Sequence, residues 1–210
     1  MGSIDLSKLA GLSGKIGPIV VYVTKGGKQV YRRHVTPVNP RTPKQVAQRA
    51  KFTLATKALS PLNKVIKRGY PGSENTFRKL IGKAYHEAIT GEYPHYAIDY
   101  SQIQIAGGNL QLPTDIRLRV DPRSGTTVLS WNPLRVWSSL PGSDNDMVYI
   151  VCFNSDKPLE VQTLKQGTRA AGQTSIKIPK GWKPETTHWW LYLTSHDMQD
   201  NSNSMYLSAE

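Results

Sequence analysis

Cysteine is almost missing from this sequence: Cys152 is the only one among 210 residues. A disulfide within the chain is therefore excluded, and so is a zinc site that needs several cysteine ligands. Cys152 lies inside the apolar run MVYIVCF, where a lone cysteine usually behaves as a small, inert apolar residue. A chain with no disulfide is typical of a reducing compartment.

Long apolar runs are missing as well. The run IGPIVVYV near the start is interrupted by Pro18 and falls far short of the roughly 18 residues that cross a membrane. The first residues, MGSIDLSKLAGLSG, lack the charged and then apolar segments of a secretory signal. We therefore expect no signal peptide and no membrane partner.

Acidic residues are scarce in the first half only. Residues 1–100 contain 17 Lys and Arg against 5 Asp and Glu, whereas residues 101–210 contain 10 of each, so the whole net charge of +12 lies in the first half. Such asymmetry indicates two parts with different surfaces, one of them suited to a polyanionic or acidic partner. A lysine-rich surface that only keeps the protein soluble explains the same charge equally well.

The motifs of common enzymes are absent from the sequence. There is no G-x-S-x-G nucleophile motif, and AGLSGKIG lacks the spacing of a phosphate-binding loop. His86 and Glu87 in YHEAIT are not followed by the second histidine of a zinc peptidase. Asp197 and Asp200 lie in SHDMQDNSNS, which has the composition of a polar hairpin loop rather than of a cation site. We predict a non-enzyme with no cofactor and no metal.

The first half begins with a predicted β-hairpin. The β-rich runs 19–24 and 29–35 flank Gly26 and Gly27, and this pair favours a tight turn in which both glycines take positive φ. Neither face of the second run is purely apolar, so we expect the hairpin to be poorly buried or to meet a partner. The segment SKLAGLSGKIGPIVVYV, which includes most of the first run, could form a first strand of the same domain or a strand donated to a neighbouring subunit.

Prolines at positions 37, 40 and 43 follow the hairpin and predict a stiff, extended segment. The last of them, with Thr42 before it, has the sequence of a helix start. Pro61 ends or kinks that helix, and a further short helix is expected after it. The clearest helical spacing of apolar residues covers residues 77–89.

The second half has the pattern of an all-β domain. Short β-rich runs recur between turn residues: YSQIQIA, DIRLRV, TTVLSW, MVYIVCF, VQTLK, TSIKIP, HWWLYLT and SMYLS. Regular short strands of this kind predict a β-sandwich. The sequence therefore predicts an α+β protein. It has a basic hairpin-and-helix domain with two or three helices over residues 1–98, a join over 99–112 and a β-sandwich over 113–210.

Three pieces of the second half resemble fibronectin type III and related immunoglobulin-like domains. TTVLSWNP places Trp131 at the end of a strand before Pro133, MVYIVCF corresponds to the third strand, and GWKPETTHWWLYLTS to the stretch that leads into a long strand. The tyrosine of that stretch falls at His188 or Trp189 here, which puts the tyrosine's usual hydrogen bond in question. The resemblance implies an immunoglobulin-like sandwich and gives almost no information about function.

The first half and its join to the second resemble an uncharacterised bacterial family of roughly this length. The matching segments are GKIGPIVVYVTKGGKQVYRR, NPRTPKQVAQRAKF, LSPLNKVIKRGY and YAIDYSQIQIAGGNL. That family has no assigned activity. The proline- and arginine-containing segment ahead of a helix is also similar to segments of small phage-encoded structural proteins, which implies assembly into a larger particle.

Eleven Lys and Arg residues of the first half are candidates for contact with an acidic subunit or with nucleic acid, because phosphate neutralisation needs cations. Three tyrosines, Tyr22, Tyr31 and Tyr70, lie among them and could stack on bases. The candidates are Lys25, Lys28, Arg32, Arg33, Arg41, Lys44, Arg49, Lys51, Lys64, Lys67 and Arg68.

Two functions are open on this basis. The first is a non-catalytic structural or assembly protein, part of a phage-like or other multiprotein particle, located in the cytoplasm or in a virion. Its partners would be further copies of itself or other protein subunits, and an oligomer is expected. The second is a soluble protein that binds nucleic acid.

Overall fold

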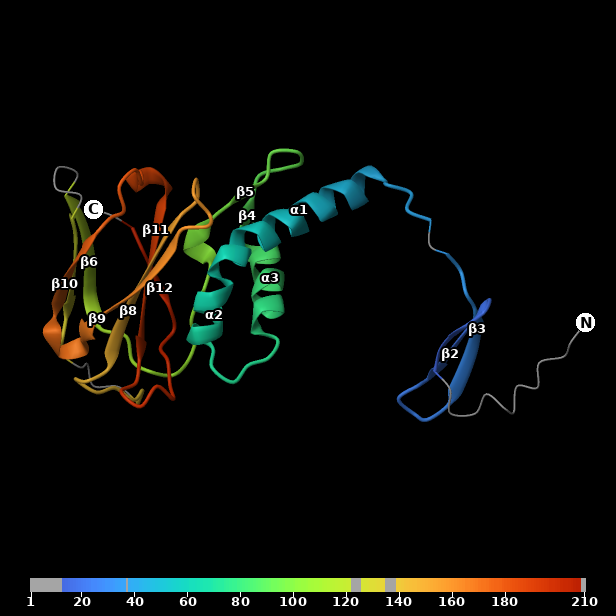
Figure 1. Cartoon of the computed structure of the whole chain (residues 1–210), viewed down its shortest axis with the longest axis horizontal. Coiled ribbons are helices and arrows are strands. Elements are labelled where there is room, and N and C mark those ends of the chain that lie inside the picture. The colour runs from blue at the N-terminus through green and yellow to red at the C-terminus, as the bar shows by residue number, and fades with distance from the viewer. Residues whose placement is uncertain (1–12, 37, 122–125, 135–138, 209–210) are drawn as a thin grey trace, which may run out of the picture. The chain divides into compact units, whose positions relative to one another are not determined.

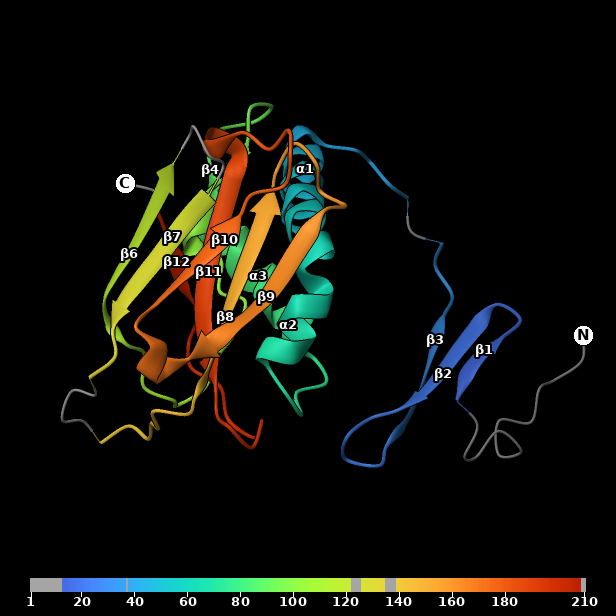
Figure 2. The same ribbon diagram turned by 60° about the vertical axis from the view of Figure 1, so that its left-hand side comes forward.

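The computed structural model describes residues 13–36, 38–121, 126–134 and 139–208. The chain divides into two compact units, Met1–Thr42 and Pro43–Glu210, and Figures 1 and 2 together label their α-helices and strands. The α+β class is confirmed. The expectation of no secretory signal falls on residues outside the described ones. None of the helices in the described ranges combines the length and the apolar character needed to cross a bilayer.

The first unit is an antiparallel sheet in the order β1-β2-β3. Its strands are β1 (Gly14–Ile16), β2 (Ile19–Val23) and β3 (Gln29–Arg33). The predicted hairpin is present as β2 and β3. β1 adds a third strand from the same chain, since it pairs with β2.

The turn between β2 and β3 differs from the predicted one. Of the two glycines, only Gly27 has a positive φ, 77°. The reason is a longer connection than expected: Thr24 and Lys28 close the loop, with the Thr24 N–H donating to the Lys28 carbonyl at 2.9 Å. A two-residue turn would have needed both glycines in the left-handed region.

The second unit begins with helices. They are α1 (Pro43–Leu59), the 3-10 turn η2 (Ser60–Leu62), α2 (Asn63–Gly69) and α3 (Thr76–Glu87). The helix start at Pro43 and the interruption at Pro61 are confirmed. α3 ends two residues before the predicted Ile89, because β4 (Ile89–Thr90) pairs with β5 (Ala97–Ile98).

Two antiparallel sheets follow the helices. One has the order β10-β7-β6 and the other β12-β11-β8-β9. All of the β-rich runs from DIRLRV onward are confirmed as strands. The strands are β6 (Thr114–Asp121), β7 (Thr126–Asn132), β8 (Met147–Asn154), β9 (Val161–Thr168), β10 (Gln173–Lys177), β11 (Thr187–Thr194) and β12 (Met205–Leu207).

The remaining predicted run, YSQIQIA, is not a strand. Its first residues form the 3-10 turn η3 (Tyr100–Gln102). The Asp99 carboxylate accepts a hydrogen bond from the Ser101 N–H at 2.9 Å, and this local contact competes with an extended backbone. The run then continues without regular structure through Ile103 and Ile105, both of which are buried.

The second unit has three layers and two buried apolar clusters. Figures 1 and 2 show helices α1–α3 on one face of the sheet β12-β11-β8-β9 and the sheet β10-β7-β6 on the other. Residues between the two sheets, such as Trp131, Ile150 and Leu191, form one cluster. The other joins Leu59 and Ile66 of the helices to the opposite face of β8 and β11.

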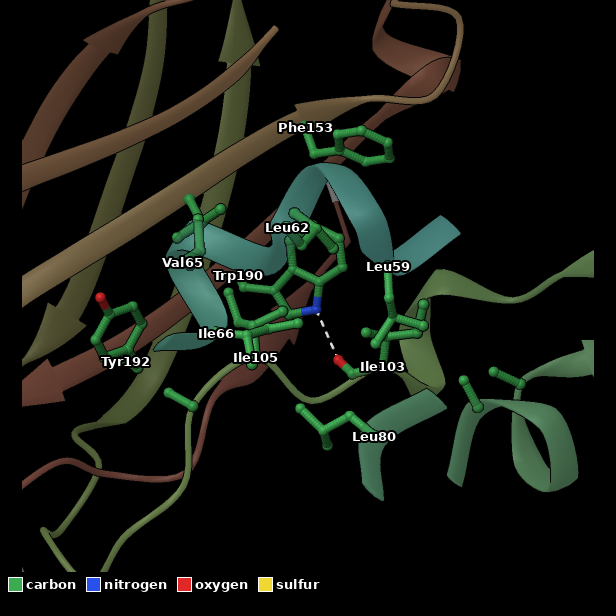
Figure 3. Packing of buried hydrophobic residues seen from close by; sticks show 14 of the residues in the cluster. Leu59, Leu62, Val65, Ile66, Leu80, Ile103, Ile105, Phe153, Trp190 and Tyr192 are labelled. Atoms are coloured by element: carbon green, nitrogen blue, oxygen red, sulfur yellow. Dashed lines mark hydrogen bonds between the residues drawn. The ribbon is translucent and has the colours of Figure 1, made fainter. Parts of the chain in front are cut away.

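The helix-to-sheet cluster is centred on large side chains from both parts. Trp190 of β11 is fully buried, and its indole N–H donates to the Ile103 carbonyl at 2.9 Å (Figure 3).

The boundary between the two compact units lies between Thr42 and Pro43, not within the join placed at 99–112. The helices and the sheet bury a common cluster, so they belong to one unit.

Candidate functional site

The eleven cationic candidates are distributed over both units. Five belong to the first unit: Lys25, Lys28, Arg32, Arg33 and Arg41. Six belong to the second: Lys44, Arg49 and Lys51 on α1, and Lys64, Lys67 and Arg68 on α2. All of them are exposed except Lys51, which is half-buried.

The first-unit cations do not share one face of the sheet. Arg32 pairs with Val20, and Arg33 pairs with Ile19. Successive residues of a strand point to opposite faces, so the two guanidinium groups leave the sheet on opposite sides. The sheet therefore presents positive charge on both faces.

On α1, one candidate has a contact within the protein. The Lys51 ammonium lies 5.1 Å from the centre of the Tyr85 ring and 6.0 Å from that of Tyr96. A cation over an aromatic face is attracted by the ring quadrupole. Lys51 thus helps to hold α1 against α3 and the loop before β5.

On α2, Lys64 and Arg68 line a hollow of about 610 Å³. Its walls come from η2 and α2 on one side and from β9 and the loop before it on the other. No lining residue is acidic. The lining residues are Ser60, Pro61, Asn63, Lys64, Val65, Arg68, Pro158, Leu159, Val161 and Thr163.

A second hollow, of about 330 Å³, adjoins the first, because Arg68 and Thr163 line both. It adds a third cation, Lys165 of β9, again with no acidic residue. Its other lining residues are Pro71, Tyr149, Thr194, Met198 and Asn201. We call the two hollows together the α2–β9 groove.

Tyr149, which lines the second hollow, takes part in aromatic stacking. The Arg68 guanidinium lies 5.8 Å from the centre of the Tyr149 ring, which stacks on Tyr192 with 5.3 Å between centroids. Burial raises the pKa of Tyr192 to about 12, and the charge of Arg68 lowers it in part. These contacts hold Arg68 at the point where the two hollows meet.

Lys165 was not among the cations predicted from the sequence. It lies in the neutral half of the chain, about a hundred residues after α2. The strand period of two does place Val161, Thr163 and Lys165 on one face of VQTLK. Nothing in the sequence shows that this face meets α2.

The contacts of His188 were not predicted from the sequence either. Its Nδ1 lies 3.0 Å from the Tyr206 hydroxyl oxygen, and its ring centre lies 4.1 Å from that of Tyr100. Burial lowers the pKa of His188, and the charge of Asp99 offsets this in part. His188 is one of two positions, with Trp189, at which the resemblance to fibronectin type III domains places a tyrosine.

The described residues contain neither a cluster of metal ligands nor a reactive thiol. Over the described ranges, no three His, Cys, Asp or Glu side chains gather into a group that could hold a metal ion. Cys152 is 1% exposed, and burial raises the pKa of its thiol to about 12, so it has almost no thiolate at neutral pH. The α2–β9 groove, with three cations and no carboxylate, is suited to an anionic ligand.

Comparison with known proteins supplies a family but no activity. No curated protein matches the chain. A family described as a family of unknown function, DUF6266, matches residues 11–208, which is nearly the whole length. The chain therefore belongs to the family of unknown function DUF6266.

Proposed function

We propose that this protein is a non-catalytic assembly protein whose first unit docks onto further copies of the chain. The observation that carries the proposal is the poor burial of that unit. Among its described residues, Val21 is the only buried apolar side chain. Ile16, Tyr22, Val23 and Tyr31 are each more than a third exposed, at 41%, 43%, 49% and 37%.

Both faces of the small sheet carry these apolar side chains. Tyr31 lies opposite Val21 on one face, and Tyr22 lies opposite Val30 on the other. A sheet buries its apolar face by packing against another layer. The described part of this unit holds no second layer, so a partner that covers one face would stabilise it.

Within the part of the chain that the structure describes, the sheet also has two open edges, because β1 and β3 each pair with β2 alone. An open edge is a template for pairing with another strand. Two β3 strands paired antiparallel about Tyr31 would put Arg33 opposite Gln29 and Arg32 opposite Val30. Like charges would then not face each other across the contact.

The segment before α1 suits a docking arm. Residues 38–42 form no helix or strand, and Val38 is 87% exposed. Prolines at 40 and 43 restrict the backbone and favour an extended path. Because similar segments occur in small phage-encoded structural proteins, we infer that the assembly is a particle of that general kind.

Variants of the exposed apolar residues test the proposal. Val23→Lys combined with Tyr31→Lys should yield a monomer by light scattering, whereas the unchanged chain should be an oligomer. Val128→Lys is the matched control, since Val128 of the second unit is 41% exposed, and it should leave the mass unchanged. Equal masses for all three proteins would refute the proposal.

Nucleic-acid binding is the second candidate, and one observation favours it. From Leu6 to Ser73 the chain contains 14 Lys and Arg and no Asp or Glu. A surface of this kind binds phosphates through release of counterions. Filter binding of single-stranded DNA at several salt concentrations is the test. Affinity that falls steeply with salt and is reduced by Arg32→Glu and Arg33→Glu would support this second function.

We also infer that the two sheets of the second unit form a fibronectin type III-like sandwich. The support is the strand order. The first, second and fifth strands of the sandwich form one sheet, and the third, fourth, sixth and seventh form the other. Trp131 of TTVLSWNP and Trp182 of GWKPETTHWWLYLTS, two of the segments that carry the resemblance, both lie in the cluster between the sheets.

A further inference from the structure

We propose that the α2–β9 groove binds an extended acidic segment of another protein, which adds as a fifth strand at the free edge of β9. This goes beyond assembly through the first unit, since the site lies wholly within the second unit. It does not depend on that assembly.

The groove follows the edge strand of its sheet. β9 ends the order β12-β11-β8-β9, so within the described ranges it pairs with β8 alone. Val161 and Thr163 line the first hollow, and Thr163 and Lys165 line the second. At roughly 3.3 Å per residue, the span from Val161 to Lys165 is about 13 Å, which is the length of about four residues of an extended peptide.

The charge of the groove points to carboxylates on that peptide. Among the described residues, no ion pair involves Lys64, Arg68 or Lys165. Glu160, the nearest acidic residue along the strand, accepts a hydrogen bond from the Trp182 indole at 2.7 Å and is not part of the lining. An incoming Asp or Glu would therefore meet cations that have no carboxylate partner.

Apolar residues beside the cations favour a peptide over a phosphate chain, because a phosphate chain has no apolar side chains to place against them. Val65, Leu159 and Val161 give apolar contacts for alternate side chains of the added strand.

The first unit of a second copy does not suit this groove. Its described residues include no Asp or Glu, while Lys15, Arg32 and Arg33 lie on its strands. Docking such a strand beside Lys64 and Arg68 would place like charges together. The occupant is therefore a different, acidic segment.

Selection from a pool of random peptides of about eight residues, bound to the full-length chain, tests the proposal. Enriched peptides should alternate Asp or Glu with apolar residues. Lys64→Glu combined with Lys165→Glu should weaken their binding by about tenfold or more. The matched control, Lys79→Glu with Lys177→Glu, also replaces two exposed lysines, and it should change the affinity by less than about twofold.

Hydrogen exchange supplies the second readout. Bound peptide should slow exchange of the β9 amides that face away from β8, those of Val161, Thr163 and Lys165, because an added strand forms backbone hydrogen bonds. If the Glu variants do not fold, Lys64→Gln with Lys165→Gln should still weaken binding. The Val23→Lys and Tyr31→Lys protein should bind as tightly as the unchanged chain, which separates this site from assembly through the first unit.

Three outcomes would overturn the proposal. One is enrichment of peptides without acidic residues. Another is equal affinity of the groove variants and the control variants. The third is competition in which single-stranded oligothymidylate or inorganic tripolyphosphate displaces the peptide while β9 amides show no added protection, which would make the groove a phosphate site.

Discussion

The indole N–H of Trp190 donates to the backbone carbonyl of Ile103 at 2.9 Å, and both residues are buried (Figure 3). The contact joins β11 to the segment that follows the helices, across 87 positions of sequence. Both residues lie in the buried cluster that also contains Leu59 and Ile66 of the helices.

Replacement of Trp190 by Phe should lower the free energy of unfolding by about 2–4 kcal/mol, because it leaves a buried carbonyl unpaired and a space beside it. Urea denaturation measures the effect. Trp182→Phe is the comparison, since that indole donates to the half-exposed Glu160 carboxylate. It should cost about half as much, and an equal loss in both variants would contradict this account.

Residues 113–210 alone should not form a stable domain. Without the helices, the face of the sheet that carries Tyr149, Phe153 and Trp190 loses the side chains that bury it. We expect this fragment to aggregate or to lack a cooperative thermal transition, whereas residues 43–210 should melt cooperatively. A sharp transition for 113–210 at the melting temperature of 43–210 would mean that the sandwich is independent.

The sequence predicted the elements better than their packing. Runs such as HWWLYLT have the β-branched and aromatic residues of buried strands, and the prolines at 43 and 61 mark helix boundaries directly. An amphipathic pattern shows that a helix has an apolar face, but it does not say which sheet covers that face. The boundary at 99–112 was placed where the sequence pattern changes, but one buried cluster contains residues from both sides of it.

Only part of the candidate site was predicted, again because the sequence does not show which elements pack together. Lys64 and Arg68 were selected because they lie in a dense basic stretch of sequence. Lys165 lies in a neutral region and joins them only because β9 is next to α2 in the fold. Lys51 looked equivalent to its basic neighbours, and only the structure shows its ammonium over two tyrosine rings.

Removal of Asp146 should destabilise the second unit strongly. Its carboxylate lies 3.4 Å from Arg169, and the two side chains are 2% and 0% exposed. Asp146→Ala leaves a buried cation without its counter-charge and should cost about 3–5 kcal/mol. Glu87→Gln breaks the exposed pair with Lys83 and should cost less than about 1 kcal/mol. Chemical denaturation that shows similar losses for both variants would contradict the buried-pair argument.

Stability should fall as the solution becomes mildly acidic, through His188. Burial lowers its pKa in the folded state, while the unfolded chain has a pKa of about 6.5. Below about pH 6.5 the unfolded chain takes up a proton at His188 that the folded chain does not. The free energy of unfolding therefore decreases as the pH falls, until the pH reaches the pKa of His188 in the folded state.

His188→Gln should flatten this part of the stability profile relative to that of the unchanged chain. Denaturation curves recorded between about pH 5 and pH 7 measure both slopes. An unchanged slope in His188→Gln would assign the pH dependence to other groups.

The most direct test of assembly through the first unit is analytical ultracentrifugation of the full chain and of residues 43–210, read at 260 and 280 nm in low and high salt. The account predicts a large species without excess absorbance at 260 nm for the full chain, and a monomer for residues 43–210. The same oligomeric state for both proteins, or a small species whose 260 nm absorbance is stripped by salt, would contradict it. The latter result would favour nucleic-acid binding.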